Sequence, residues 1–146
     1  MDFNDNFSLK GILTIRVHKN GILIAEHVEN NLIVNGARDQ VVRLIAGNTV
    51  GRNIAQIAFG TNGTTPEVTD SVITQQYARP INGFSYPAMG QVQFDWELPV
   101  TENNGMAIME FGLLTDDGML FARRTRRYPI HKESDISIEG HWTILL

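Results

Sequence analysis

The sequence contains no cysteine, which excludes disulfide bonds, thiolate metal sites, a cysteine nucleophile and thiol redox chemistry. It has no apolar run near the roughly 20 residues that span a bilayer, so membrane insertion is not expected. Lys and Arg number 12 against 16 Asp and Glu, and this excess of acid does not favour a nucleic-acid partner. The acidic, polar residues 1–6 are unlike a signal peptide. These absences predict a soluble domain made in a reducing compartment.

The residues that are present are typical of one folded domain. The chain has 146 residues, of which 42% are hydrophobic and 19% charged, a balance that argues against disorder. A chain of this length buries about two-thirds of its unfolded surface. We therefore expect a single domain over residues 1–146, in which residues 1–6 form a flexible arm.

A β-hairpin is the first strong structural signal. Two alternating segments, residues 13–17 and 22–28, flank Asn20-Gly21, the dipeptide most typical of a type I′ turn. Pairing Lys19 with Ile22 sets Val17 opposite Ile24 and Leu13 opposite Val28. The hairpin is then expected to have one apolar face, made of Leu13, Ile15, Val17, Ile24 and Val28.

One short helix is predicted after the hairpin. Asn35 is placed to cap its N-terminus, and Gly47 is a typical left-handed terminator. Asp39 and Arg43 form an i,i+4 ion pair. The apolar stripe consists of Ala37, Val41, Leu44 and Ile45.

Beyond the helix, side chains alternate with the period of two that is typical of strands. Strands are expected at residues 54–59, 91–98, 106–114, 119–125 and 136–146, with a long surface connection over residues 60–70. The hairpin around residues 116–118 is predicted to have a three-residue loop with a left-handed Gly118, which sets Leu113 beside Phe121 and Glu110 beside Arg124. Many short strands with one helix predict a mainly β fold, an antiparallel β-sandwich with one short α-helix.

Catalytic motifs are not evident in the sequence. Asp95 and Glu97 lie on one strand face about 6.6 Å apart, a spacing within the range of glycosidase carboxylates, but any polar strand face produces it. His18 and His27 are about 13 Å apart in the predicted hairpin, too far to share a metal ion. We therefore assign no catalytic, cofactor-binding or metal-ligating residue, and we do not expect an enzyme.

Four arginines within residues 123–127 are the most unusual composition in the chain. Arg123 and Arg127 are expected on one strand face, and Arg124 and Arg126 on the other. They could pair with carboxylates in this chain or a neighbouring subunit, remain solvated, or bind an anionic ligand. Aromatic residues beside proline also suit a docking loop or a rim over the core. Candidate subunit-interface residues are Arg123, Arg124, Arg126, Arg127, Tyr86 and Tyr128.

An ordered set of motifs resembles a known class of proteins. The motifs are residues 31–36 (NLIVNG), 57–64 (IAFGTNGT), 85–87 (SYP), 91–94 (QVQF), 107–114 (AIMEFGLL), 118–123 (GMLFAR) and 134–144 (SDISIEGHWTI). In this order they are similar to small tail or baseplate structural proteins of tailed bacteriophages, over roughly residues 30–146.

That resemblance implies a non-enzymatic component of the virion tail, baseplate or tail-fibre attachment region, without a cofactor. It would be synthesised in the host cytoplasm and assemble with other tail proteins, as a homo-oligomer such as a trimer or ring. Two alternatives remain: a tail module that binds host-surface glycan through the exposed aromatic and arginine side chains, and a hydrolase of cell-wall polysaccharide that uses Asp95 and Glu97.

Overall fold

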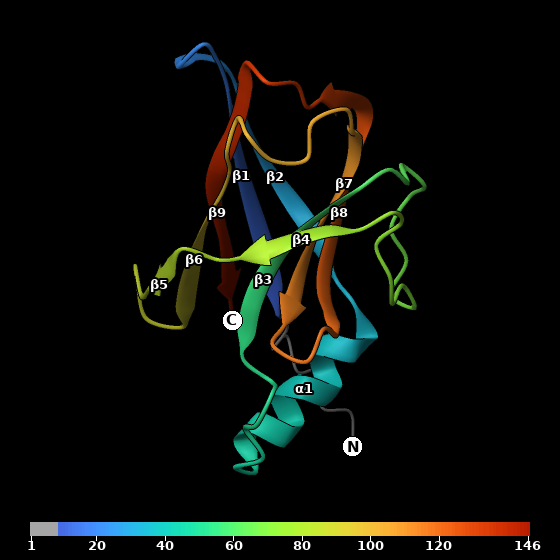
Figure 1. The fold of residues 1–146 in the computed structure, drawn as a ribbon. Coiled ribbons are helices and arrows are strands. Elements are labelled where there is room, and N and C mark those ends of the chain that lie inside the picture. Colours follow the sequence, from blue (N-terminus) through green and yellow to red (C-terminus); the bar gives the residue numbers. More distant parts are fainter. Residues whose placement is uncertain (1–8) are drawn as a thin grey trace.

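The computed structural model describes residues 9–146, so the expected arm at residues 1–6 lies outside the described residues. Within that range the chain forms nine strands and one helix (Figure 1). Their bounds are β1 (Lys10–Lys19), β2 (Ile22–Ile33), α1 (Asn35–Ile45), β3 (Ile54–Gly60), β4 (Tyr77–Pro80), β5 (Gly83–Ser85), β6 (Gln91–Leu98), β7 (Ala107–Thr115), β8 (Leu120–His131) and β9 (Ile136–Leu145).

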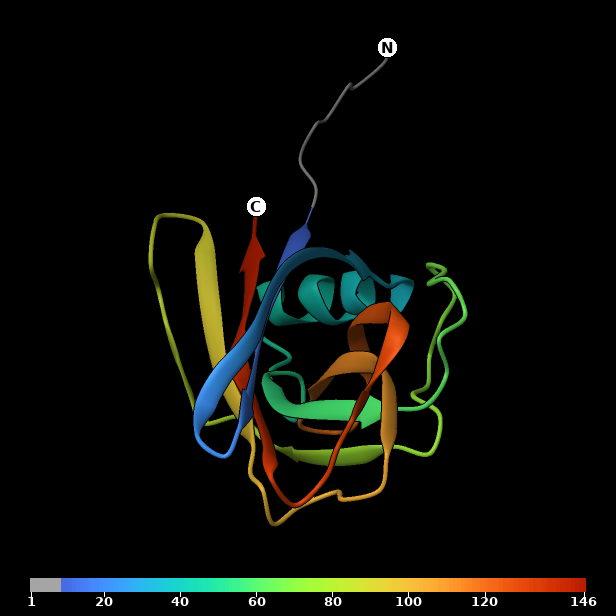
Figure 2. The same ribbon diagram turned by 90° about the horizontal axis from the view of Figure 1, so that it is seen from above.

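All nine described strands belong to one antiparallel sheet, in the order β4-β3-β7-β8-β2-β1-β9-β6-β5, which curls into a half-barrel (Figures 1 and 2). The mainly β fold with one short helix is thus confirmed, and the two layers of the expected sandwich are halves of a single sheet. Strand β2 joins them: it pairs with β1 along most of its length, but with β8 only through Leu32 and Ile33.

Large aromatic side chains fill the space between the two halves of the sheet. The Trp96 ring from β6 lies 5.8 Å from that of Phe59 on β3 and 5.9 Å from that of Phe111 on β7, measured between centroids. Gly140 on β9 allows this packing, because a Cβ at that position would clash with the Thr14 carbonyl oxygen on β1 and would lie 3.1 Å from Trp96 Cζ2. Burial alternates along β9, as its sequence predicts.

The first hairpin has the predicted turn but not the predicted faces. Lys19 pairs with Ile22 around Asn20-Gly21 as expected, but a bulge beyond His18 adds one residue to β2. Leu13 therefore faces Glu29 and not Val28, and Val17 faces Ala25 and not Ile24. A one-residue shift turns every later side chain to the opposite face. Ile24 and Val28, expected in the core, are consequently 56% and 63% exposed.

The β7–β8 hairpin also differs from the prediction by one residue. Its three-residue loop and left-handed Gly118 (φ 88°) are confirmed. A register irregularity beside Leu114 then sets Leu113 opposite Ala122 and Glu110 opposite Thr125, so the predicted partners Phe121 and Arg124 are wrong. Strands β4 and β5, and the extension of β8 to His131, were not predicted.

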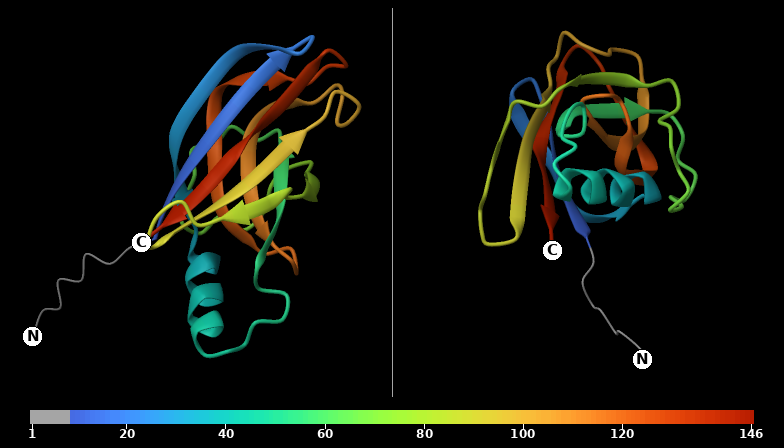
Figure 3. Two further views of the ribbon diagram at one scale, coloured as in Figure 1. Left: turned by 90° about the vertical axis from the view of Figure 1, so that its left-hand side faces the viewer. Right: turned by 90° about the horizontal axis from the view of Figure 1, so that it is seen from below.

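Helix α1 lies at the end of the sheet where β9 ends (Figures 1 and 3). Its N-cap is Val34 without a side-chain hydrogen bond, so the capping role expected of Asn35 is wrong. The Asp39–Arg43 pair (3.0 Å) and the left-handed Gly47 (φ 84°) are confirmed. Ile45, expected in the apolar stripe, is 81% exposed. No helix within residues 9–146 is long and apolar enough to cross a membrane.

Candidate interaction surfaces

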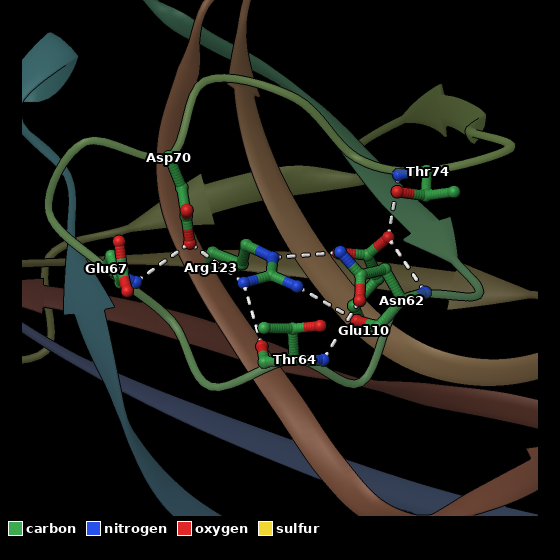
Figure 4. A network of polar contacts seen from close by, with 7 residues as sticks. All are labelled: Asn62, Thr64, Glu67, Asp70, Thr74, Glu110 and Arg123. Carbon is green, nitrogen blue, oxygen red and sulfur yellow. Dashed lines mark hydrogen bonds and ion pairs between the residues drawn. The ribbon is translucent and has the colours of Figure 1, made fainter.

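Arg123 is buried inside the protein and makes two ion pairs there. Its side chain is 3% exposed. The Nε atom donates to Glu110 Oε2 and the Nη1 atom to Asp70 Oδ2, each at 2.8 Å (Figure 4). Strand β8 supplies the arginine, the neighbouring β7 supplies Glu110, and the long β3–β4 connection supplies Asp70. This placement leaves Arg123 without a surface to offer a second subunit.

The same pair of side chains holds the β3–β4 connection against the sheet. Arg123 donates to the carbonyl oxygens of Asn62 (2.9 Å) and Thr64 (3.1 Å). The fully buried Glu110 accepts from the backbone N–H groups of Asn62 (3.2 Å) and Thr74 (2.7 Å). The long connection, typical of functional loops, is therefore anchored at both ends by charge-assisted hydrogen bonds (Figure 4).

Arg124 and Arg126 bridge the opening between β2 and β8. Arg124 donates to Glu29 Oε2 (2.7 Å) and to the Asn30 carbonyl oxygen (2.9 Å). Arg126 Nη1 lies 3.8 Å from Glu29 Oε1. Burial lowers the pKa of Arg126, and the nearby Glu29 partly offsets that shift. Arg124 and Arg126 share Glu29 as a partner, which agrees with the prediction that they lie on one face of β8. That partner belongs to the same chain.

The remaining predicted interface residues are exposed and lie on two different elements. The Arg127 guanidinium sits 5.7 Å from the ring centroid of Tyr128, and both residues are exposed on β8. Tyr86 is 74% exposed in the β5–β6 connection, with its ring 5.8 Å from that of Phe84. The six candidate residues therefore do not form one surface.

Tyr86 belongs to an apolar groove between α1 and the β5–β6 connection. The groove has a volume of about 760 Å³, and its floor includes Phe94 and Ile144. Its rim carries side chains with unusually high exposure: Phe84 at 61%, Tyr86 at 74% and Met89 at 100%. Contiguous exposed apolar side chains are typical of interaction sites. The aromatic and proline composition of residues 84–87 indicated this region, whereas the helix wall could not be assigned without the fold.

Asp95 and Glu97, the candidate hydrolase carboxylates, lie on the outer face of β6, as the alternation predicts. Asp95 accepts a hydrogen bond from Gln93 Nε2 (3.2 Å), and Glu97 lies 3.6 Å from Arg79 Nη1. Glu97 is exposed and Asp95 half-buried. This arrangement is that of a solvated, ion-paired strand face.

The two hairpin histidines point to different surroundings. His18 Nε2 lies 3.3 Å from Glu139, whereas His27 Nε2 lies 3.5 Å from Arg126. The bulge in the hairpin separates them. Across residues 9–146, no group of three or more His, Cys, Asp or Glu side chains could hold a metal ion.

Lys132, which the sequence did not single out, is a second buried cation. Its Nζ donates to Asn104 Oδ1 (2.7 Å), the Glu133 carbonyl oxygen (3.2 Å) and the Val100 carbonyl oxygen (3.4 Å). Burial lowers its pKa, opposed by the nearby carboxylates, with Glu102 first among them. Three acceptors match the three donors of an ammonium group, so Lys132 anchors the β6–β7 connection.

The resemblance to phage tail proteins rests on the ordered motifs of the sequence. Most of those motifs coincide with strands of the structure, such as residues 107–114 within β7 and residues 136–144 within β9. Strand alternation alone does not identify a function. Comparison with protein-family models, with curated proteins and with solved structures gives no match to this chain.

Proposed function

We propose that this chain is a non-enzymatic structural component of a bacteriophage tail, baseplate or tail-fibre attachment region, which assembles through subunit contacts. The observation that carries the proposal is the apolar groove whose rim side chains Phe84, Tyr86 and Met89 are 61%, 74% and 100% exposed. Large side chains of this kind are enriched in protein–protein interfaces. The ordered sequence motifs supply the link to the phage tail.

Coexpression of the chain with tail and baseplate proteins tests the proposal. We expect a stable complex or a homo-oligomer, detected by the mass of the purified species. The variant Met89→Ser changes one fully exposed groove side chain and should weaken that complex, while Val50→Ser, at a position 90% exposed outside the groove, should not. A chain that stays monomeric and binds none of the coexpressed proteins would contradict the proposal.

A host-glycan-binding tail module is the second candidate, favoured by the exposed Arg127–Tyr128 pair. Stacked aromatic and guanidinium groups can contact sugars and anionic groups. Retained affinity for a surface polysaccharide after Arg127→Ala and Tyr128→Ala would remove this candidate. Turnover that is unchanged by Asp95→Asn with Glu97→Gln would likewise remove the hydrolase assignment.

A further inference from the structure

Leu9, the first described residue, lines two grooves. The first is the apolar groove above, of about 760 Å³, and the second has a volume of about 900 Å³. Leu9, Val41 and Leu146 line both. Leu9 therefore lies at two open, largely apolar surfaces.

Both grooves carry positive charge, next to buried polar atoms that have no partner among the described residues. Arg52 lines the first groove, where its Nη1 donates to Gln40 (3.0 Å) while its buried Nε has no partner among the described residues. Lys10 and Arg38 line the second, together with a buried Asn31 Nδ2 that is likewise unpaired within residues 9–146. Among those residues, no Asp or Glu side chain lines either groove.

A complementary occupant needs apolar anchors together with acidic groups. Residues 1–8 (MDFNDNFS) have that composition: two phenylalanines, two aspartates and no lysine or arginine. In an extended conformation, alternate side chains point the same way, which places Phe3, Asp5 and Phe7 on one face. The carboxylate would then lie between two aromatic anchors, as an apolar groove with one arginine requires.

We propose that residues 1–8 of one copy dock into the first groove of a second copy, with Phe3 and Phe7 on its apolar wall and Asp5 against Arg52. This inference deepens the proposed assembly function and rests on it. Eight extended residues reach at most about 27 Å, enough to cross a contact between neighbouring copies. Docking of the segment into the groove of its own copy is the competing outcome, and it would leave the wild type monomeric.

We call residues 1–8 the docking arm. A contact between the docking arm of one copy and the first groove of the next copy is heterologous, because it joins two different surfaces. Such contacts continue from copy to copy until they close into a ring or extend as a filament. Each copy then carries two different contact surfaces, and these can be disabled separately. Removing both aromatic anchors should raise the dissociation constant on the order of 100-fold, because each buried aromatic contributes roughly a factor of ten or more.

The test uses two full-length variants and measures mass by analytical ultracentrifugation. The arm variant is Phe3→Ser with Phe7→Ser, and the groove variant is Phe84→Ser with Met89→Ser. Both groove side chains are exposed, so the fold should be retained, and circular dichroism checks this. Val50→Ser is the matched control outside the groove. We expect oligomers from the wild type and the control, and monomers from each variant alone.

Mixing the two variants is the decisive step. One variant still has a working groove and the other a working arm, so an equal mixture should form a dimer that cannot grow further. A mixture that stays monomeric, an arm variant with wild-type mass, or a monomeric wild type would each overturn arm exchange. Binding of coexpressed tail proteins is measured separately on the arm variant. If that binding persists while arm exchange fails, the proposed function stands and this inference alone is lost.

Discussion

The arginine-rich part of β8 and the apolar groove use side chains in opposite ways. In the first region, charged groups of the kind that often contacts external partners are paired within the chain, and Arg123 is buried and pairs with Glu110 and Asp70. In the second, apolar side chains of the kind that usually fills a core are exposed, and Met89 is fully exposed. An unusual cluster of charge is therefore weak evidence for an interface, and a local excess of exposed apolar surface is stronger evidence.

Arg123 and Arg52, one arginine from each region, differ in how completely their polar groups are satisfied. Arg123 makes four hydrogen bonds, two to carboxylates and two to carbonyl oxygens. Arg52 at the groove leaves its buried Nε without a partner in the described part of the chain. A satisfied network stabilises a single conformation of one chain, whereas the half-buried Arg52 carries a positive charge at the groove that an acidic partner could pair with.

Replacing Arg123 should have the largest effect on stability. Arg123→Ala leaves the fully buried Glu110 without its counter-charge, which we expect to lower the free energy of unfolding by about 3–5 kcal/mol. Urea denaturation measures this change, and hydrogen exchange should show faster exchange of the Asn62 and Thr74 amides. Arg127→Ala, at an exposed position four residues along β8, is the control and should change stability by less than about 0.5 kcal/mol. Equal effects of the two variants would remove the contrast between buried and exposed arginines.

A smaller loss of stability is expected when the ion pairs that bridge β2 and β8 are removed. Glu29→Gln removes the charge that Arg124 and Arg126 share, and because the carboxylate is partly exposed the loss should be about 1 kcal/mol and should shrink at high salt. Asp39→Asn on α1 is the matched control, since its exposed pair with Arg43 contributes only about 0.3–0.5 kcal/mol. A larger loss from the helix variant would contradict a bridging role for Glu29.

The sequence predicted most of the elements because their signals are local. Alternation along residues 91–98 and 136–145 and the left-handed Gly118 depend on neighbouring residues alone, and the structure has them as expected. The bulge beyond His18 carries no clear local signal, yet it reverses the faces of β2. Such errors in register are expected, since one inserted residue leaves the hydrophobic pattern unchanged on either side of it.

The sites were harder to predict because their partners are distant in sequence. Arg123 meets Asp70 across 53 positions, and Arg124 meets Glu29 across 95. Charge composition indicated that the arginines need carboxylates but could not say which carboxylates. The groove combines α1 with the β5–β6 connection, and it depends on the sheet curling so that these elements face each other.

A substitution on the rim of the apolar groove should weaken association between chains without changing the stability of the single chain. Met89→Ser replaces a side chain that is 100% exposed, so the free energy of unfolding should change by less than about 0.5 kcal/mol. Association, measured by ultracentrifugation, should weaken. Ile144→Val on the groove floor is the comparison: its side chain is buried, and the change should cost about 1 kcal/mol of stability. A strongly destabilised Met89→Ser variant would show that the rim serves the fold of the single chain.

A tyrosine that is bonded within the chain contrasts in the same way with Tyr86 at the open groove. Tyr77 on β4 donates to Glu102 in the β6–β7 connection, and this hydrogen bond, together with burial and the charge of Glu102, raises the pKa of Tyr77 above its usual 10.0. Between pH 10 and that raised value the folded state binds the phenolic proton more strongly than the unfolded state does. Stability from this contact is therefore complete below pH 10 and is lost as the pH rises through the raised pKa.

Tyrosinate absorbance measures this ionisation directly. Tyr77→Phe should remove the step at highest pH from the titration curve of the folded protein. Tyr86→Phe, which removes only the hydroxyl group of an exposed tyrosine at the groove, should leave that step in place. If the late step persists in Tyr77→Phe, the hydrogen bond to Glu102 is not its cause, and the contrast between an internally bonded tyrosine and an open groove fails at this residue.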